Sequence, residues 1–536
     1  MESFFQYRRV QESVRRHLSE LGDTGTAYVY ASRSPQDTKS STNDEEMPEK
    51  QATDTQDAPD DIILVSWNGP DDPLNPANQS TRRKLVMTIL VSLIALVVTA
   101  ASAIDACGVR EYSRYFHVSE VVGSLATGLF LIGFAFGSLF SGPFSETFGR
   151  NAIYLTTMLL FLIFIMASGL APNLHSHLIF RFLAGFFAST PLSCAGGTVA
   201  DLWDPLQKTY AFPVYAIPAF AGPMIGQIIG SYLSTTPGLG WRWLEWIMLI
   251  MGGVVLIIVS LFQPETYGNL ILHWKASILR KETGDERFRA PMEMKRESLG
   301  QRLKLSVIRP FAMFYSELII VLISLYLTVI YIVLFTFLEG YTYVFGEAYG
   351  ISEGLTSLCW AGMLIGILLV SLVVPVVYRI TAEDYKRHSL TGKSSSISPE
   401  IRLWYTMLGG APAVPISLFW MGWTSNASIS IWSPLIASVL FGFGITTIFI
   451  ISYMYLIDAY DTFSASALGF LVFTRYVVAG GVTIAGGPIY RAIGVQYTLT
   501  ILGSLSAVMT AVPYLLYIYG PQIRKRSKYA VNFDTA

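Results

Sequence analysis

Residues 221–230 read AGPMIGQIIG, with a glycine at every fourth position of an apolar stretch. If the stretch is helical, Gly222, Gly226 and Gly230 lie on one face, because four residues make about one helical turn. A face without side chains lets another helix approach to backbone distance, which is typical of packed transmembrane helices. Pro223 removes one intrahelical hydrogen bond and adds a kink or a stiff point. The pattern therefore predicts close helix packing within a membrane.

The composition of the whole chain indicates a membrane protein. Of its 536 residues, 52% are hydrophobic and only 14% are charged, whereas soluble domains carry about 25% charged residues. Apolar runs long enough to cross about 30 Å of hydrocarbon recur along the chain. We expect twelve spans, near residues 85–107, 121–142, 152–171, 178–199, 210–233, 241–262, 313–338, 354–378, 403–423, 432–457, 465–486 and 495–517.

Lysine and arginine are concentrated in alternate loops. They gather before the first expected span, between the sixth and seventh, between the eighth and ninth, and after the twelfth. The opposite loops carry few of them. The positive-inside rule therefore places both termini and the central loop in the cytosol. An even number of spans agrees with this, since the chain must return to the side on which it started.

These patterns divide the chain into five parts. The cytoplasmic tail contains a basic amphipathic segment at 4–18 and an acidic, Ser/Thr-rich stretch at 34–61 that we expect to be disordered. The segment 4–18 suits a helix on the inner leaflet, although a solvated tail fits it equally. The parts are the tail (1–81), a six-helix half (82–262), the basic cytoplasmic loop (263–312), a second six-helix half (313–517) and a cytoplasmic C-terminal tail (518–536).

An internal repeat relates the two halves. The sequence DLWD at 201–204, after the fourth span, is echoed by DAYD at 458–461, after the tenth. Gly185 and Gly442 are separated by the same 257 residues as the two acidic pairs. Both acidic pairs fall at the cytoplasmic ends of equivalent spans, as two halves related by an axis along the membrane normal require.

The sequence contains no pattern typical of an enzyme. It lacks a GxxxxGK[ST] loop, so we do not expect ATP hydrolysis. The six histidines form no ligand cluster along the chain, and we expect no metal, no cofactor and no nucleic-acid partner. A protein that moves solutes without ATP couples to an ion gradient or facilitates diffusion. Coupling to protons needs charged groups at membrane depth.

Arg181 is the leading charged residue of this kind, because it lies a few residues into the fourth span. An arginine stays charged, so it would bias a neighbouring carboxylate or anchor a hydrogen bond. The alternative is that Arg181 extends to the outer interface. Arg475, inside the eleventh span, is a second arginine for which the same two roles are considered. Four acidic residues lie near span ends, where we expect interfacial or capping groups: Asp105, Glu245, Glu317 and Glu339.

The loop between the second and third spans reads GPFSETFGRN at 142–151. In it, Gly149 permits a tight turn, and Glu146 and Arg150 can meet on one helix face. The loop is similar to the major facilitator superfamily signature G-x-x-x-[DE]-R-x-G-R-[KR] at Gly142, Glu146, Gly149 and Arg150, and departs from it at Thr147 and Asn151.

The chain resembles this superfamily, and within it the fungal twelve-span drug:proton antiporters, over residues 62–530. The sequences RFLAGFF at 181–187, WRWLEW at 241–246 and PETY at 264–267 are also similar to fungal members. The antiporter motif of the fifth span, G-x-x-x-G-P-x-x-G-G, is matched at Gly222, Gly226 and Gly230, with Pro223 one turn early and departures at Gln227 and Ser231.

The resemblance implies an all-α integral membrane fold of twelve transmembrane helices in two pseudo-repeated six-helix halves. It implies that Glu146 and Arg150 belong to a cytoplasmic gate that contacts the partner half through Asp201. It also implies that Arg181 takes part in proton coupling. The glycine face would pack against a neighbouring helix and restrict leak, which favours exchange over free uniport.

The expected function is therefore proton-coupled efflux of small amphipathic organic compounds, either xenobiotics or an endogenous metabolite. The alternatives are a proton symporter that imports a small nutrient and a non-transporting membrane sensor. We expect the plasma membrane, or alternatively the vacuolar membrane, and as partners the substrate, protons and lipid but no obligate protein. The sequon at Asn426 lies in an expected outer loop and is a candidate glycosylation site, whereas the sequon at Asn78 lies on the cytosolic side.

Overall fold

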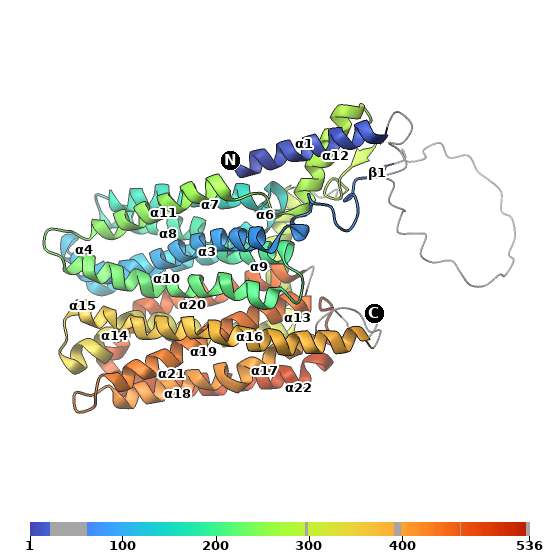
Figure 1. The fold of residues 1–536 in the computed structure, drawn as a ribbon. Helices are drawn as coiled ribbons and strands as arrows, with labels where there is room; N and C mark the ends of the chain where they lie inside the picture. The colour runs from blue at the N-terminus through green and yellow to red at the C-terminus, as the bar shows by residue number, and fades with distance from the viewer. Residues whose placement is uncertain (22–61, 295–298, 391–397, 461–462, 532–536) are drawn as a thin grey trace.

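The computed structural model describes residues 1–21, 62–294, 299–390, 398–460 and 463–531. The stretch 34–61, expected to be disordered, lies outside the described residues. Long helices lie side by side in one bundle, and its blue-to-green helices pack against its yellow-to-red helices (Figure 1). The bundle therefore consists of two halves that follow one another along the chain.

The helices of the first half lie between residues 81 and 262. They are α3 (Thr81–Ile104), α4 (Val109–Tyr115), α5 (Glu120–Gly123), α6 (Leu125–Phe148), α7 (Arg150–Gly169), α8 (Leu174–Ala188), α9 (Thr190–Leu202), α10 (Lys208–Thr235) and α11 (Arg242–Phe262). The second half contains α14 (Leu318–Tyr341), α15 (Glu353–Leu358), α16 (Trp360–Leu390), α17 (Leu403–Tyr405), α18 (Ala411–Thr424), α19 (Trp432–Tyr460), α20 (Ser464–Ile493), α21 (Val495–Met509) and α22 (Ala511–Lys525).

Eleven helical segments among the described residues are long and apolar enough to cross a membrane. The remaining expected span, 403–423, corresponds to α17, a π-helical segment and α18, which follow one another without a break. At about 1.5 Å per residue this segment also spans the hydrocarbon core. Large apolar side chains on the outside of the bundle are more than half exposed, as lipid-facing positions require; examples are Ile257, Leu372 and Val508.

The two halves meet along helices from the middle of each half. Helix α6 packs along α20, and α10 packs along α16. Aromatic rings fill the contact: Phe134 stacks on Tyr476 with ring centroids 4.4 Å apart, and Phe220 lies 4.5 Å from Phe449. These interdigitating rings close the centre of the bundle in this conformation.

The N-terminal tail and the central loop form a small unit beside the bundle. Helix α1 (Glu2–Leu21) packs on α12 (Gly268–Thr283), and β1 (Ile63–Leu64) pairs in parallel with β2 (Phe288–Arg289) (Figure 1). Val10 and Val14 of α1 are buried in the core of this unit. The apolar face of segment 4–18 therefore contacts protein, whereas Phe4 remains 57% exposed.

The basic region between the two halves continues with α13 (Leu299–Ser316), which contacts α6 and α20. We refer below to the end of the bundle beside α12 as the α12 end. The opposite end, which holds α4 and α15, is the α4 end (Figure 1).

Candidate functional site

Arg181 lies at the centre of a polar cluster buried within the first half. Its Nε is 2.9 Å from Asp105 Oδ2, and its Nη1 is 3.6 Å from Glu245 Oε2. His177 Nε2 lies 3.7 Å from the same Asp105 oxygen. Ser168 Oγ donates to Glu245 Oε1 and lies 2.9 Å from His177 Nδ1. These five residues, which we call the Arg181 cluster, are each at most 1% exposed.

The surroundings of Arg181 hold its side chain inside the protein. Its Nη2 donates to the carbonyl oxygen of Ala101 at 2.9 Å, and its guanidinium lies 4.5 Å from the Phe130 ring centroid. Because the side chain is fully buried, Arg181 does not extend to an interface. The arginine therefore ties α8 to the end of α3.

Asp105 and Glu245 lie near helix ends, as the sequence indicates, but they are not interfacial groups. Asp105 follows α3 directly and Glu245 lies in the first turn of α11. The rings of Tyr112 and Trp241 pack on His177 at 5.6 and 5.1 Å and cover the cluster. The expectation of interfacial or capping roles is thus wrong for these two carboxylates, because α4 and the start of α11 shield them.

The glycine face of α10 lies against α3. A Cβ atom at Gly226 would stand 2.5 Å from the carbonyl oxygen of Ala100, and one at Gly222 would stand 2.6 Å from that of Leu96. A Cβ at Gly230 would meet Ile104 Cγ1 at 2.8 Å. No side chain fits at such distances, so the backbones of α3 and α10 touch along this face.

Gln227 and Ser231, which depart from the antiporter motif, make polar contacts of their own. Gln227 Nε2 donates to the carbonyl oxygen of Ala103 on α3 at 2.7 Å. Ser231 Oγ donates to the carbonyl oxygen of Glu353 in the second half at 3.1 Å. Pro223 is buried within α10, which also contains Pro213.

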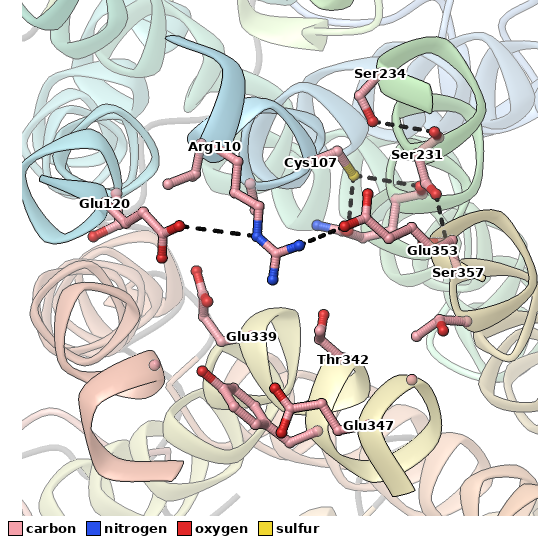
Figure 2. Close-up of a pocket in the computed structure, with 18 of the residues that line it drawn as sticks. Cys107, Arg110, Glu120, Ser231, Ser234, Glu339, Thr342, Glu347, Glu353 and Ser357 are labelled. Atoms are coloured by element: carbon pink, nitrogen blue, oxygen red, sulfur yellow. Dashed lines mark hydrogen bonds and ion pairs between the residues drawn. The ribbon is translucent and has the colours of Figure 1, made fainter. Parts of the chain in front are cut away.

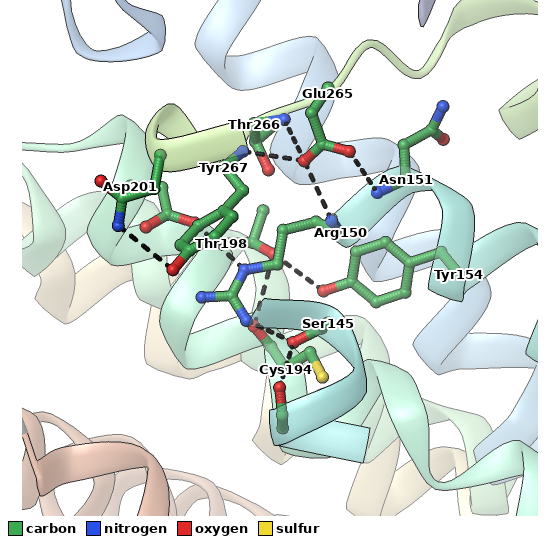
Figure 3. Close-up of polar contacts among 12 residues, drawn as sticks. Ser145, Arg150, Asn151, Tyr154, Cys194, Thr198, Asp201, Glu265, Thr266 and Tyr267 are labelled. Carbon is green, nitrogen blue, oxygen red and sulfur yellow. Dashed lines mark hydrogen bonds and ion pairs between the residues drawn. The ribbon is translucent and has the colours of Figure 1, made fainter. Parts of the chain in front are cut away.

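Arg150 begins α7 at the α12 end and is held from several sides (Figure 3). Its Nε donates to Asp201 Oδ2 at 3.1 Å, and its Nη1 donates to Ser145 Oγ at 2.6 Å. Its backbone N–H donates to Glu265 Oε1 at 2.9 Å, and its guanidinium lies 5.2 Å from the Tyr267 ring centroid. These partners lie in the first half or at the start of the central loop, so the network braces the first half and does not reach the second.

Glu265 is the acidic partner of Arg150 that the loop sequence does not indicate. Its carboxylate also accepts the backbone N–H groups of Asn151, Thr266 and Tyr267 (Figure 3). It therefore caps the start of α7, where unpaired N–H groups favour an anion. Burial nevertheless raises the pKa of the Glu265 carboxyl.

The other residues of the loop motif have different surroundings. Gly149 has φ of +92°, and an added Cβ would stand 2.5 Å from Glu265 Oε2, so the turn requires glycine. A Cβ at Gly142 would meet open space. Glu146 is exposed, and no ion pair joins it to another of the described residues. The structure thus brings Arg150 and Asp201 together but leaves Glu146 outside the network.

Arg402 makes the corresponding contact in the second half and also reaches the first. Its Nε donates to Asp458 Oδ2 at 2.9 Å. Its Nη1 donates to Thr209 Oγ1 at 2.6 Å, and its Nη2 donates to the carbonyl oxygen of Pro205 at 3.0 Å. The two halves are therefore tied together at the α12 end by Arg402.

At the α4 end the halves enclose a cavity of about 280 Å³ (Figure 2). Two ion pairs cross it between the halves: Arg110 Nη1 to Glu353 Oε1 at 2.5 Å, and Arg491 Nη2 to Glu120 Oε2 at 2.7 Å. Glu339 also lines the cavity. Asn426 is exposed in the connection between α18 and α19, at this same end.

Sequence reasoning singled out Arg150 and Arg181 but did not assign Glu265 and Glu245 as their partners. Glu245 stands in the motif WRWLEW and Glu265 in PETY, so the family resemblance marked both stretches. No sequence spacing joins Arg402 to Asp458, but the echo of DLWD in DAYD indicates that Asp458 has the surroundings of Asp201.

Comparison with known proteins identifies the family. The Major Facilitator Superfamily model matches residues 85–484. The chain is 47% identical over 467 residues to the MFS-type transporter kojT of Aspergillus flavus, covering 87% of this chain and 82% of that protein. It is 36% identical to the ascochitine biosynthesis cluster MFS transporter of Didymella fabae, covering 88% of this chain and 90% of that protein.

A solved structure shares the fold. The proton:xylose symporter XylE aligns with a TM-score of 0.59 at 13% identity, over 82% of this chain and 96% of that one. This agrees with the expected twelve-helix architecture in two halves. The chain belongs to the major facilitator superfamily, and it is an integral membrane transporter rather than an enzyme.

Proposed function

We propose that this transporter exports small amphipathic organic compounds in exchange for protons. In this proposal the α12 end faces the cytosol and the α4 end faces the outside, in accordance with the lysine and arginine distribution. The cargo is an endogenous metabolite or a xenobiotic, and the membrane is the plasma membrane, with the vacuolar membrane as the alternative.

The charge balance of the Arg181 cluster carries the proposal. One permanent positive charge on Arg181 faces two carboxylates, Asp105 and Glu245, in a region shielded from solvent. Two buried carboxylates beside one cation leave an excess negative charge, and binding one proton removes it. The hydroxyl of Ser168 and the ring of His177 connect the two carboxylates. The cluster thus has the chemistry of a site that takes up and releases one proton.

A chain of contacts joins the Arg181 cluster to the interface between the two halves, which supports coupling of protonation to transport. Arg181 donates to Ala101, and the neighbouring Ala100 is the residue against which Gly226 of α10 packs. Helix α10 in turn carries Phe220, which contacts Phe449 of the second half. Protonation of Asp105, which follows α3, weakens the pull of Arg181 on the end of α3. Because α3 and α10 touch backbone to backbone, a shift of α3 moves α10 with it.

The names of two relatives support export of a metabolite. One relative is named for an ascochitine biosynthesis cluster and another, from Monascus ruber, for a citrinin biosynthesis cluster. A transporter associated with a biosynthetic cluster fits removal of the product from the producing cell. Import by proton symport is the alternative that a transport experiment decides.

The experiment uses inside-out vesicles from cells that overexpress the full chain, with an acid interior. The probes are two fluorescent amphipathic compounds, 7-hydroxycoumarin and rhodamine 6G. An exporter accumulates a probe in the lumen as protons leave it, whereas a symporter that imports expels a preloaded probe under the same gradient. Accumulation that persists after the gradient is collapsed would contradict coupling.

Variants assign the coupling to the cluster. Arg181→Ala should lose gradient-driven accumulation by at least about tenfold, because the carboxylates lose their shared cation. Arg114→Ala is the matched control, since Arg114 is exposed on α4 at the same end of the bundle. If Arg181→Ala retains gradient-driven transport, Arg181 has no part in coupling.

A further inference from the structure

Arg475 is a second fully buried arginine, and its surroundings differ from those of Arg181. It lies on α20 at 0% exposure, within the second half. Among the described residues no carboxylate forms an ion pair with its guanidinium, whereas Arg181 is shared by two. A buried charge without a counter-ion is costly. Its retention therefore needs an explanation that packing alone does not supply.

Four aromatic rings surround the Arg475 guanidinium and form what we call the aromatic cage. The carbon of the guanidinium lies 4.6 Å from the ring centroid of Tyr331, 5.2 Å from those of Phe449 and Tyr453, and 5.3 Å from that of Tyr476. The faces of these rings attract the cation and offset part of the cost of burying it. They also leave flat apolar walls beside a fixed positive charge.

The hydrogen-bonding capacity of Arg475 is largely unused. Its Nη2 donates to Tyr453 Oη at 2.7 Å. Its Nε and Nη1 are buried and have no hydrogen-bond partner among the described residues. These two nitrogens carry N–H groups on different sides of the planar guanidinium, and each can donate to an oxygen of an anion.

The aromatic cage faces the other half of the transporter. Phe134 of α6 stacks on Tyr476 with an interplanar angle of 23°, and Phe220 of α10 lies against Phe449. In this conformation rings of the first half therefore cover the cage. When the halves separate at one end, as alternating access requires, the faces of Tyr476 and Phe449 lose these partners. A flat ring from the cargo can then take the place of Phe134 or Phe220.

We propose that Arg475 and the aromatic cage bind the transported compound, and that this compound is a small planar organic anion. Its conjugated or aromatic ring stacks on the cage walls, and its carboxylate or deprotonated hydroxyl accepts a hydrogen bond from Nε or Nη1 of Arg475. The anion supplies the missing counter-charge, so a neutral analogue of the same shape leaves the arginine uncompensated. This inference rests on the proposed transport of small organic compounds and names their chemical class.

The test is equilibrium binding to the purified full chain in lipid nanodiscs at neutral pH, measured by isothermal titration calorimetry. Three probes separate charge from shape: benzoate, benzyl alcohol and cyclohexanecarboxylate. We expect benzoate to bind at least about tenfold more tightly than benzyl alcohol, and several-fold more tightly than cyclohexanecarboxylate, which lacks the flat ring. Equal binding of benzoate and benzyl alcohol would overturn the proposal.

Variants locate the binding. Arg475→Gln should reduce benzoate affinity to that of benzyl alcohol while leaving benzyl alcohol affinity unchanged. If Arg475→Gln does not fold, Tyr476→Leu serves instead and should abolish the preference for benzoate over cyclohexanecarboxylate. Its control is Phe473→Leu on the same helix, because Phe473 packs on Phe136 and Phe311 outside the cage. A preference for benzoate over benzyl alcohol that survives in Arg475→Gln would contradict the proposed binding site. So would a preference for benzoate over cyclohexanecarboxylate that survives in Tyr476→Leu.

The readout also separates this inference from the proposed function. Binding in nanodiscs needs no proton gradient, so a defect of coupling at Arg181 does not abolish it. Conversely, gradient-driven transport of rhodamine 6G, a cation, with no binding of benzoate would retain proton-coupled export and reject the planar anion as cargo.

Discussion

Arg402 occupies in the second half the position that Arg150 occupies in the first. Each arginine donates through Nε to the aspartate of the repeated acidic pair, at 2.9 Å to Asp458 and at 3.1 Å to Asp201. Only Arg402 continues across the boundary, to Thr209 and Pro205. The same arginine–aspartate ion pair is therefore present in both halves with different surroundings. Arg150 braces the first half, whereas Arg402 joins the two halves.

This asymmetry predicts that Arg402→Ala opens the α12 end. Hydrogen bonds from a charged donor contribute about 1.5–3 kcal/mol each, so their loss should shift the open population by about tenfold or more. Spin labels at Asp204 and Arg379, both exposed and in opposite halves, measure the separation. Arg150→Ala is the matched control and should leave the distance unchanged. Equal widening in both variants would contradict a specific tie at Arg402.

Gly226→Leu should abolish transport while the protein still inserts into the membrane. The new side chain would meet the backbone of Ala100 and push α10 away from α3. Gly253→Leu on α11 is the control, because a Cβ there has nothing within 4 Å. Vesicle uptake and membrane abundance are measured for both variants. Normal uptake by Gly226→Leu would refute the close-packing argument.

Glu245→Gln should uncouple transport from protons without removing the cargo path. A neutral side chain leaves one carboxylate, Asp105, for Arg181, so the cluster loses its excess negative charge. We expect gradient-driven accumulation to fall at least about tenfold while exchange of labelled for unlabelled cargo continues. Asp105→Asn should behave similarly. Loss of exchange together with accumulation would instead indicate a structural role for Glu245.

The orientation predicts opposite labelling of two exposed asparagines. Asn426 follows α18 at the α4 end, and Asn78 precedes α3 at the α12 end. In intact cells a membrane-impermeant maleimide should label Asn426→Cys, and it should label Asn78→Cys only after permeabilisation. Glycosylation of Asn78, detected by a mobility shift on endoglycosidase treatment, would reverse the orientation.

Stability of the unit formed by α1 and α12 should rise with pH above about 8. Lys275 lies on α12, outside the membrane spans, and its Nζ donates to the carbonyl oxygen of Ser66 and to Asn68 Oδ1. Burial lowers the pKa of Lys275 to about 8. The pKa of a lysine in an unfolded chain is about 10.4. Between about pH 8 and this value the unfolded state binds more protons than the folded state, so the free energy of unfolding increases as pH rises.

The gain should reach about 2 kcal/mol between pH 7 and pH 9.5. Thermal unfolding in detergent at the two pH values measures it. Lys275→Met should remove the pH dependence, and Lys281→Met, which changes an exposed lysine of the same helix, should keep it. A flat profile in the unmodified protein would show that Lys275 is not desolvated.

Much of the fold could be predicted from local pattern. Hydropathy located the membrane helices, because a backbone in hydrocarbon must satisfy its hydrogen bonds internally and so forms long apolar helices. The prediction of the major facilitator fold is confirmed by the family match over residues 85–484. The amphipathic pattern at 4–18 anticipated the helix α1 but not its partner, since nothing in that segment specifies α12.

The partners of the buried charges could not be predicted in the same way. Asp105 follows α3 and Glu245 lies in the first turn of α11, positions typical of interfacial residues. Their burial depends on α4 and Trp241, which pack over them. Arg181 and Arg475 both stand inside apolar spans, yet one meets two carboxylates and the other four aromatic rings. Helix rotation and tilt decide such meetings, and neither follows from periodicity.

The sequence by itself determined that the chain crosses the membrane, where it does so, and that Gly222, Gly226 and Gly230 form a bare helix face. These properties follow from the hydrocarbon thickness and the helical repeat, which act on each segment separately. Only the tertiary structure decided that this face meets α3, that Arg181 is shared by Asp105 and Glu245, and that Arg475 has no counter-ion among the described residues. These contacts join segments far apart in the chain, and packing of the whole bundle sets their distances.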